Sequence, residues 1–486
     1  MNQPLYRRVQ DQLIGAILRG AAPAGSRLPS LRRLAKDLGV SRITVEAAYE
    51  ALQAQGLIEA RARSGNYVTR HAAHAGAPRE GHRGEALPWE VRLAPCANPA
   101  RERMLAQVFR NAGTAGVTFA WGAGDPALFP VDAFRAIIDR ILRRAGGAAL
   151  GPAETQGDPA LREAFAAYLR KLDLAVGADD IVVTTGSQQA IELVVGALVR
   201  PGERVIVEET TWPGALGTLE AAGADIVGVP LDEHGMRLDA LERALGQGGA
   251  RLIYTIPTFQ NPTGTVMPAA RRHELVRLAR RHGVPVLEDD ALREVRFGSP
   301  LPPPLATLDP SGNVIYAGSF SKSVLPAARL GYLVAPPKLR QWAVTRKRSM
   351  DMFCPPLMQR AMADYLESGQ AMRFWKKISR VYAARQRTMD EALARRFPRG
   401  TRWRRVEGGP VLWVKLAGRV SVRRLFDDAV RAGVGFAPGE AFFVAPADQP
   451  YIRLNFAAVE EERIERGIQT LGALLGAANH EQEIAT

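Results

Sequence analysis

The sequence predicts an α/β protein made of a small N-terminal helix-and-strand module and a large domain with a mainly parallel sheet. Three observations predict this organisation. Residues 4–69 read as three helices followed by two short strands, residues 71–90 lack hydrophobic periodicity, and the remainder alternates short apolar runs with helix-like stretches. Such alternation is typical of strands that are buried on both faces by helices. We therefore divide the chain into a module at 1–70, a linker at 71–110 and a large domain at 111–486.

The composition is that of a globular protein with a large core. The chain has 486 residues, of which 47% are hydrophobic and 23% are charged, as in ordinary domains. No apolar run reaches about 18 residues and the first residues lack the apolar core of a signal peptide, so we expect a cytoplasmic protein without membrane contact. The two cysteines, Cys96 and Cys354, form no cluster of metal ligands, and we expect no metal.

Positive charge is concentrated near the N-terminus. The chain has a formal net charge of +14 and a pI near 10.1. Residues 1–70 contain 11 Arg and Lys residues against five Asp and Glu residues, so this short segment holds nearly half of the surplus. A basic segment favours an acidic partner such as DNA. A solvated basic face in an arginine-rich protein is the alternative, and charge alone does not decide between them.

The N-terminal module contains three predicted helices. The first spans 4–20, where apolar residues recur at helical spacing. The second spans 30–38 and ends at Gly39. The third spans 42–55 and follows Ser41, a residue type that often caps helix N-termini. The second and third helices are thus joined by a tight turn.

Two short strands, at 56–60 and 65–69, follow the helices around an arginine-rich turn. Two helices joined by a tight turn and followed by a strand pair describe a winged helix-turn-helix, whose second helix enters the major groove of DNA. The basic and hydroxyl side chains expected to contact DNA are Arg32, Ser41, Arg42, Thr44, Arg61 and Arg63. A three-helix interaction domain with incidental arginines is the alternative at this point.

A resemblance supports the DNA-binding interpretation. Most of residues 4–69 is similar to the GntR family of bacterial transcriptional regulators. The residues that carry it are Leu28-Pro29-Ser30-Leu31-Arg32, Leu38-Gly39-Val40-Ser41-Arg42-Ile43-Thr44-Val45 and Gly56-Leu57-Ile58. The resemblance implies DNA contacts from Arg32, Arg42 and Thr44. Glu46 stands where some members carry another arginine, so base preference does not transfer.

The large domain is predicted to have two lobes, a large one at about 155–345 and a smaller α+β lobe at about 111–150 and 350–480. The smaller lobe should contain strands near 411–416 and 451–456. The apolar runs that predict the main sheet are 181–185, 204–208, 225–231, 252–257, 284–288, 314–317 and 331–335.

Polar side chains follow several of these strands at their C-terminal ends, where open α/β sheets bind ligands. Lys322 comes after the strand at 314–317, Asp289 after the one at 284–288, and Gly186 begins a Gly-Ser turn before a helix. An amine, a carboxylate, a phosphate cradle and aromatic cover for a ring are what pyridoxal 5′-phosphate requires. Trp212 supplies the fourth feature. The sequence therefore predicts this cofactor.

Lys322 is the predicted attachment point, through a Schiff base (aldimine), because it is the only lysine between Lys171 and Lys338. A generic surface lysine is the alternative. Asp289 is expected to pair with the pyridine nitrogen, although its neighbour Asp290 is one residue away. The predicted cofactor-binding set is Gly186, Ser187, Gln188, Trp212, Asn261, Asp289, Ser319, Ser321, Lys322 and Arg329. Within it the first three residues, both serines and Arg329 cradle the phosphate, Asn261 bonds the ring hydroxyl and Trp212 stacks on the ring.

A second resemblance covers roughly residues 119–457, which are similar to fold-type I, class I aminotransferases. The residues that carry it are Ser319-Phe320-Ser321-Lys322, Arg329-Leu330-Gly331, Gln260-Asn261-Pro262-Thr263-Gly264 and Tyr451-Ile452-Arg453-Leu454-Asn455. The resemblance implies that Arg453 binds the α-carboxylate of an amino compound, for which a guanidinium offers bidentate geometry. A plain salt bridge is the alternative for Arg453.

Several positions depart from the aminotransferase pattern. Leu292 and Ala291 stand where these proteins or their regulatory relatives have a tyrosine, Pro152 stands where a partner-subunit tyrosine commonly reaches the phosphate, and Trp212 replaces a stacking tyrosine. These changes weaken proton transfer around the cofactor. We therefore expect at most weak or half-transamination.

The order of the two parts resembles the MocR/GabR family of pyridoxal-phosphate-dependent transcriptional regulators. The resemblance implies a homodimeric regulator that senses an amino compound, or the cofactor itself, through the aldimine at Lys322. Trp212 is followed by Pro213-Gly214-Ala215 rather than by an arginine, which argues against an ω-amino acid held at both ends. An active aminotransferase with an accessory N-terminal module, and a regulator that has lost the cofactor, are the alternatives.

Overall fold

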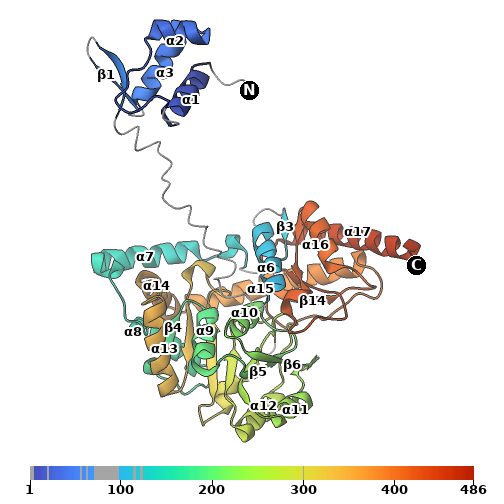
Figure 1. The fold of residues 1–486 in the computed structure, drawn as a ribbon. Helices are drawn as coiled ribbons and strands as arrows, with labels where there is room; N and C mark the ends of the chain where they lie inside the picture. The colour runs from blue at the N-terminus through green and yellow to red at the C-terminus, as the bar shows by residue number, and fades with distance from the viewer. Residues whose placement is uncertain are drawn as a thin grey trace. The chain divides into compact units, whose positions relative to one another are not determined.

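The computed structural model contains two compact units, Met1–Pro95 and Cys96–Thr486, which are described separately (Figure 1). The residues that it describes are 5–18, 21–54, 57–61, 64–69, 98–112, 116–120, 124–298 and 300–485.

The first unit contains the predicted winged helix-turn-helix. Helices α1 (Leu5–Leu18), α2 (Leu31–Leu38) and α3 (Arg42–Ala54) are followed by strands β1 (Ile58–Arg61) and β2 (Gly65–Val68), which pair antiparallel. The predicted elements are therefore present, with ends that differ by one or two residues. The unit has its own apolar core, which includes Val9, Leu13, Ile17, Val45, Ala48, Tyr49, Leu52, Ile58 and Val68.

The turn between α2 and α3 depends on three local features. Ser30 caps α2, and its side chain accepts a hydrogen bond from the Arg33 amide. Gly39 ends the helix in the left-handed conformation, at φ 64°, which a side chain would disfavour. Ser41 accepts a hydrogen bond from the Thr44 amide at 3.1 Å, so it caps α3 as the sequence predicted. These caps fix the angle at which α3 leaves the turn.

The second unit is built on a seven-stranded sheet with the order β4-β12-β11-β10-β9-β5-β6. β12 (Gly331–Val334) runs antiparallel to both of its neighbours and the other pairings between adjacent strands are parallel. The other strands are β4 (Ile181–Thr184), β5 (Arg204–Glu208), β6 (Asp225–Val229), β9 (Ala250–Thr255), β10 (Val286–Asp289) and β11 (Val314–Ser319). Every apolar run that predicted this sheet overlaps one of these strands, so the α/β fold class is confirmed.

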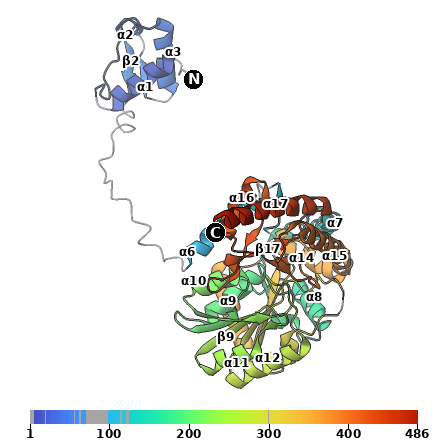
Figure 2. The ribbon, with the colours of Figure 1, turned by 90° about the vertical axis from the view of Figure 1, so that its right-hand side faces the viewer.

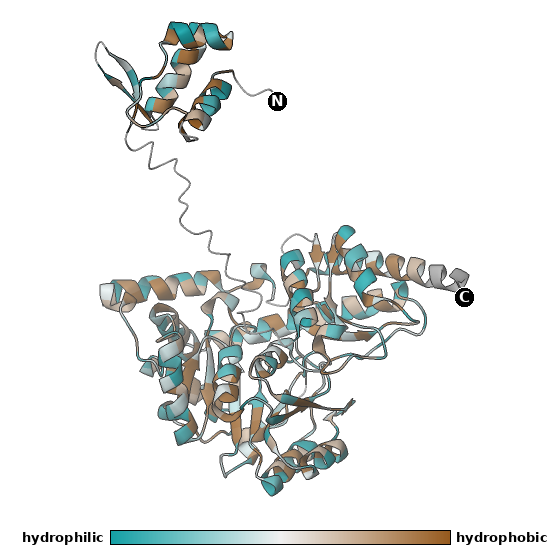
Figure 3. Cartoon of the chain, in the orientation of Figure 1, coloured by the Kyte–Doolittle hydropathy of each residue, from teal (hydrophilic) through white to brown (hydrophobic). Residues whose placement is uncertain are grey.

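Helices cover both faces of this sheet. On one face Val182 packs among residues of α9 (Ser187–Leu198), α10 (Pro213–Ala221) and α13 (Pro337–Met350). On the other, Ile206 and Ile253 pack against α11 (Leu238–Gly246) and α12 (Ala269–His282). The strands are hydrophobic along most of their length (Figure 3), because neither face contacts water.

The C-terminal part has a four-stranded antiparallel sheet with the order β13-β14-β17-β16. Its long strands, β14 (Val411–Lys415) and β17 (Tyr451–Asn455), match the two predicted ones. Helices α15 (Gln370–Arg396) and α17 (Glu461–Ala485) lie side by side next to it (Figure 2). β13 (Arg402–Trp403) and β16 (Ala437–Pro438) are too short for their pattern to predict them. The proposed limits of the two lobes stay a prediction.

The predicted linker at 71–110 is wrong at its C-terminal end. Helix α6 occupies Pro99–Ala112, because Leu105, Val108 and Phe109 recur at helical spacing and Val108 is buried. The absence of periodicity that indicated a linker applied to residues 71–90, and residues 70–97, with Cys96, lie outside the described residues. None of the helices described is long and apolar enough to cross a membrane.

Candidate functional site

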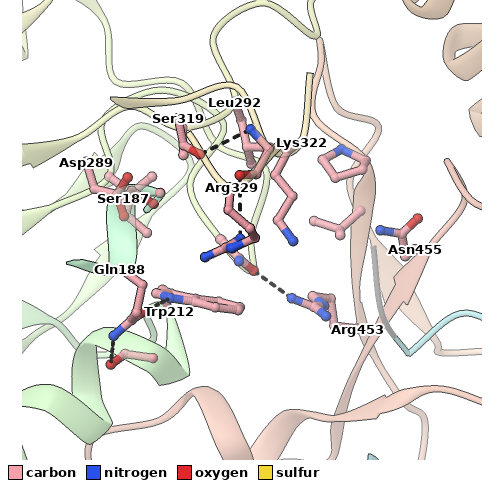
Figure 4. Close-up of a pocket in the computed structure, with 18 of the residues that line it drawn as sticks. Ser187, Gln188, Trp212, Asp289, Leu292, Ser319, Lys322, Arg329, Arg453 and Asn455 are labelled. Atoms are coloured by element: carbon pink, nitrogen blue, oxygen red, sulfur yellow. Dashed lines mark hydrogen bonds between the residues drawn. The ribbon is translucent and has the colours of Figure 1, made fainter. Parts of the chain in front are cut away.

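A cavity of about 480 Å³ lies at the C-terminal ends of the parallel strands. All of the residues predicted to hold the cofactor line it, and Arg453 lines it as well. These predicted residues in the cavity wall are Gly186, Ser187, Gln188, Trp212, Asn261, Asp289, Ser319, Ser321, Lys322, Arg329 and Arg453. Strand ends far apart in the sequence therefore bring one amine, one carboxylate and two guanidinium groups to the same space (Figure 4).

Lys322 extends into the cavity from the loop after β11 (Figure 4). Its side chain is half-buried, and burial lowers the pKa of its amine to about 8. The positive charges of Arg453 and Arg329 contribute to the same lowering. Lys322 is thus a stronger nucleophile near neutral pH than an ordinary lysine.

This pKa gives a prediction for cofactor loading. At pH 7 about 10% of amines with a pKa near 8 are uncharged, against about 0.03% for an ordinary lysine. The rate at which the protein reacts with pyridoxal 5′-phosphate should therefore rise about tenfold per pH unit below about pH 8 and level off above it. Stopped-flow absorbance from pH 6 to about 10 measures this profile, and a rate that kept rising to the upper end would contradict it.

Asp289 ends β10 on the opposite side of the cavity from Arg453 (Figure 4). Its Oδ2 accepts a hydrogen bond from the Tyr254 hydroxyl at 2.9 Å, while its buried Oδ1 has no hydrogen-bond partner among the described residues. Burial raises the pKa of Asp289 to about 7, and the negative charge of Asp290 adds to this. A cationic ring nitrogen at Oδ1 would satisfy the orphaned atom and stabilise the carboxylate.

Asp290 has a different environment, so geometry distinguishes the two neighbours. It does not line the cavity, and its Oδ2 accepts hydrogen bonds from Tyr316 at 2.8 Å and from Arg293. Tyr254 was not predicted as part of the site, because a tyrosine inside an apolar strand reads as an ordinary core residue. Side chains alternate between the two faces of a sheet along each strand, so this period could have placed Tyr254 on the same face of the sheet as Asp289.

The turn before α9 has the features of an anion cradle. Gly186 has φ 106°, and a Cβ atom there would lie 3.1 Å from the Arg329 guanidinium, so a side chain would crowd the two groups. Arg329 donates to the Thr185 carbonyl at 2.6 Å and approaches Ser321 Oγ at 3.5 Å, and it forms no ion pair with any residue that the structure describes. Together with the N-terminus of α9, these groups fit a phosphate.

Gln188 has a role that the sequence did not predict. Its side-chain oxygen accepts a hydrogen bond from Trp212 Nε1 at 3.0 Å, and its Nε2 donates to Gly214 and Thr218 at 2.9 Å each. The Gln188 side chain therefore orients the Trp212 indole rather than the phosphate cradle. A Cβ at Gly214 would lie 2.4 Å from Trp212 Nε1, so this glycine also leaves room for the ring.

Arg453, on β17, is 5% exposed. Its Nη1 donates to Asn261 Oδ1 at 3.1 Å, and its Nη2 donates to the Ala120 carbonyl at 2.7 Å. Burial lowers the pKa of Arg453 to about 10. Among the described residues its Nε has no hydrogen-bond partner and no carboxylate pairs with it. The salt-bridge alternative is therefore unsupported, and a buried unpaired guanidinium favours an anionic ligand.

The positions that depart from the aminotransferase pattern lie in two places. Ala291 and Leu292 line the cavity, where neither offers a hydroxyl, whereas Pro152 does not line it. The cavity wall described therefore contains no tyrosine. Asn261 uses its side-chain oxygen to accept from Arg453, so only its NH₂ group is left to donate to a ligand.

The predicted DNA contacts of the first unit fall into three groups. Ser41 and Arg42 are exposed at the turn, and Arg32 is exposed in the first turn of α2. Thr44 is half-buried beside Ser41, with 2.8 Å between the hydroxyl oxygens. Arg61 pairs with Glu59 at 2.7 Å and lies over the Tyr67 ring at 4.5 Å, so it is already engaged. Arg63 lies outside the described residues.

Ile43 was not predicted to contact a partner, yet it is 78% exposed in the first turn of α3. The buried residues of α3 are Val45, Ala48, Tyr49 and Leu52, and at helical spacing Ile43 lies on the opposite face. The period of the helix could therefore have placed Ile43 outward, beside the exposed Arg42. An exposed apolar side chain on a recognition helix can contact thymine methyl groups.

Comparison with known proteins gives matches for both units. Residues 5–68 match the family described as bacterial regulatory proteins, gntR family, and residues 118–471 match aminotransferase class I and II. The probable rhizopine catabolism regulatory protein MocR of Rhizobium meliloti is 30% identical over 96% of this chain and 93% of its own length. Aromatic-amino-acid aminotransferase 1 of Thermococcus litoralis is 34% identical over 73% of this chain and 87% of its own length. The crystal structure of a multiple substrate aminotransferase from Thermococcus profundus superposes with a TM-score of 0.76 and 31% identity, covering 81% of this chain and all of that chain.

Proposed function

Because this chain belongs to the aminotransferase class I and II family and, as a MocR-type fusion, also carries a GntR-family helix-turn-helix domain, we propose that it is a transcriptional regulator that senses an amino compound, or pyridoxal 5′-phosphate itself, at Lys322. A domain of the GntR family implies DNA binding, and the aminotransferase family is pyridoxal-phosphate-dependent. The proposal rests on one observation above all. A single chain combines exposed basic side chains at the turn of its winged helix with a cavity that gathers Lys322, Asp289 and Arg453.

The residues of the cavity divide the work of binding between them. Lys322 offers an amine whose pKa is lowered to about 8, Arg329 and the α9 N-terminus would hold a phosphate, and Asp289 would hold the ring nitrogen. When bound, the cofactor supplies an aldehyde carbon with which a primary amine can form a covalent bond. Arg453 then orients the carboxylate of an incoming amino compound. Leu292 and Ala291 provide no hydroxyl to move a proton, so we expect at most weak or half-transamination.

A ligand in this cavity can influence the segment that leads to the DNA-binding module. Phe109, which lines the cavity, belongs to α6, the first helix of the second unit. Arg101 of the same helix is buried, pairs with Glu220 and donates to the Phe443 carbonyl at 2.6 Å. α6 therefore contacts α10 on one side and the C-terminal part on the other, and differential contacts with a ligand would shift its position. We expect the regulator to act as a homodimer, because one winged helix seldom supplies enough contacts for tight operator binding.

DNA binding by the first unit can be tested on single arginines. Replacing Arg42 by alanine should weaken binding to DNA from upstream of the protein's own gene by about 5- to 100-fold, since an exposed guanidinium in the recognition helix is lost. Arg61→Ala should cost less, because Arg61 is already paired with Glu59. Fluorescence anisotropy at fixed salt measures both, and equal affinities for wild type and Arg42→Ala would contradict the assignment.

The proposal as a whole is tested by two assays on the full chain. A regulator should shift its upstream DNA in a mobility assay and show little steady turnover of amino acids with 2-oxoglutarate. Steady transamination without any DNA shift would instead identify an active aminotransferase with an accessory module. The absence of an absorbance band at about 420 nm after incubation with pyridoxal 5′-phosphate would indicate a regulator that has lost its cofactor.

A further inference from the structure

Apart from the residues predicted to hold the cofactor, the described wall of the cavity is mostly apolar. Side chains from four separate segments form it, namely α6, the loops after β9 and β10, and the start of β14. These side chains are Phe109, Ile256, Ala291, Leu292, Pro410 and Val411. The nearby polar residues of the wall are Asn455 and Arg453. A bound ligand would therefore meet hydrocarbon over most of the surface that it presents to this side.

Among the described residues that line the cavity, one cation is left for such a ligand. Arg329 faces the anion cradle at Thr185 and Ser321, and Lys322 is needed for the cofactor. Arg453 remains, 5% exposed, bonded to two neutral oxygens and without a carboxylate partner within the described residues. Its Nε is buried and finds no acceptor among the residues that the structure describes. One anionic group on the ligand would satisfy this guanidinium.

A second charge on the ligand would have no partner in the part of the wall that the structure describes. Asp289 is the one acid among the residues described as lining the cavity, and it is placed beside Tyr254 at the opposite side from Arg453. A second carboxylate or a distal amine would be buried against the apolar side chains without compensation, which is strongly unfavourable. A neighbouring cavity of about 500 Å³ is lined by Glu102 and Glu192 and has Phe109 in its wall as well. Neither glutamate lines the cavity that contains Lys322.

We propose that the effector is an α-amino acid with an apolar side chain, whose carboxylate pairs with Arg453 and whose side chain packs against Phe109 and Leu292. This inference rests on the proposed function, because it concerns the compound sensed at the same cavity. Phe109 is 50% exposed at the edge of the cavity, so seating an apolar side chain against it also removes its own surface from water. Side-chain recognition would thereby act on α6, the first helix of the second unit.

Binding of amino acids to the full chain loaded with pyridoxal 5′-phosphate tests the proposal. The change of the absorbance band at about 420 nm as each amino acid is added gives the affinity of that compound. L-Leucine and L-phenylalanine should bind at least about tenfold more tightly than glycine, L-glutamate, L-lysine and 4-aminobutanoate, because they alone bury a large apolar group. Equal or tighter binding of glutamate, lysine or 4-aminobutanoate would overturn the inference while leaving an amino-sensing regulator in place. A loaded protein that responds to none of these compounds would overturn both.

Variants separate side-chain recognition from general damage to the site. Phe109→Ala and Leu292→Ala should each weaken leucine and phenylalanine by about fivefold and leave glycine unchanged, because glycine has no side chain to contact them. Met372→Ala, an exposed apolar residue of α15, is the matched control and should bind every compound as the wild type does. If Phe109→Ala and Leu292→Ala weakened glycine as much as leucine, or affected neither compound, the assignment of these side chains would be wrong.

Discussion

Replacing Lys322 by alanine should abolish the absorbance band at about 420 nm that the protein acquires with pyridoxal 5′-phosphate. Lys322 is the lysine that lines the described cavity, and its amine has a pKa of about 8, so no other described side chain there can form the covalent bond. Because the cofactor would be held only by noncovalent contacts and would leave with the free cofactor, the variant freed of unbound cofactor should also lose its response to amino compounds. Spectra recorded after removal of free cofactor measure the first effect.

The control for this experiment is Lys338→Ala, which removes an exposed lysine of α13. It should keep the full band. A band of undiminished intensity in Lys322→Ala would mean that another amine carries the cofactor. Circular dichroism of both variants distinguishes loss of attachment from loss of folding, because an alanine at this position at the edge of the cavity leaves the core side chains untouched.

Replacing Arg453 by alanine should have the second largest effect. The side chain is buried without a described counter-charge, so removal of its charge-assisted contacts should weaken binding of α-amino acids about 10- to 100-fold. Because the charge of Arg453 contributes to the lowered pKa of Lys322, the same variant should shift the pH profile of cofactor loading upward. Two independent readouts thus follow from one substitution.

Two further variants sharpen the Arg453 experiment. Arg453→Lys keeps the positive charge but loses the planar fork, so it should retain more of the Lys322 pKa shift than of the ligand affinity. Arg402→Ala, an exposed residue of β13, should change neither quantity. If Arg453→Ala bound amino acids as the wild type does, the carboxylate of the effector would not be recognised by this guanidinium.

Much of the fold could be predicted from the sequence, because its main elements carry strong local patterns. The runs at 204–208 and 331–335 are apolar on both faces, and only buried strands tolerate such segments. Gly39 and Ser41 mark the turn of the winged helix through backbone and capping chemistry that acts within a few residues. Helix α6 escaped prediction because the linker was extended beyond residues 71–90, the segment that lacks periodicity, although Leu105, Val108 and Phe109 recur at helical spacing.

The candidate site was predictable where a residue type is demanded by the chemistry and not where the role depends on packing. Lys322 and Asp289 are rare residue types at strand ends, so their positions stand out. Tyr254 and Gln188 act through hydrogen bonds to other side chains, namely Asp289 and Trp212. Such partners are 24 or more residues apart in the chain, and only the three-dimensional arrangement of the strand ends reveals them.

The most direct test of the central claim is a measurement of DNA affinity with and without an amino acid. Fluorescence anisotropy with the DNA upstream of the protein's own gene is recorded for the pyridoxal-phosphate-treated wild type and for Lys322→Ala. A saturating amino compound, with L-leucine as the first probe, should change the affinity of the wild type by at least about fivefold and that of the variant not at all. An unchanged affinity in the wild type, or an equal change in both proteins, would contradict a regulator that senses its effector at Lys322.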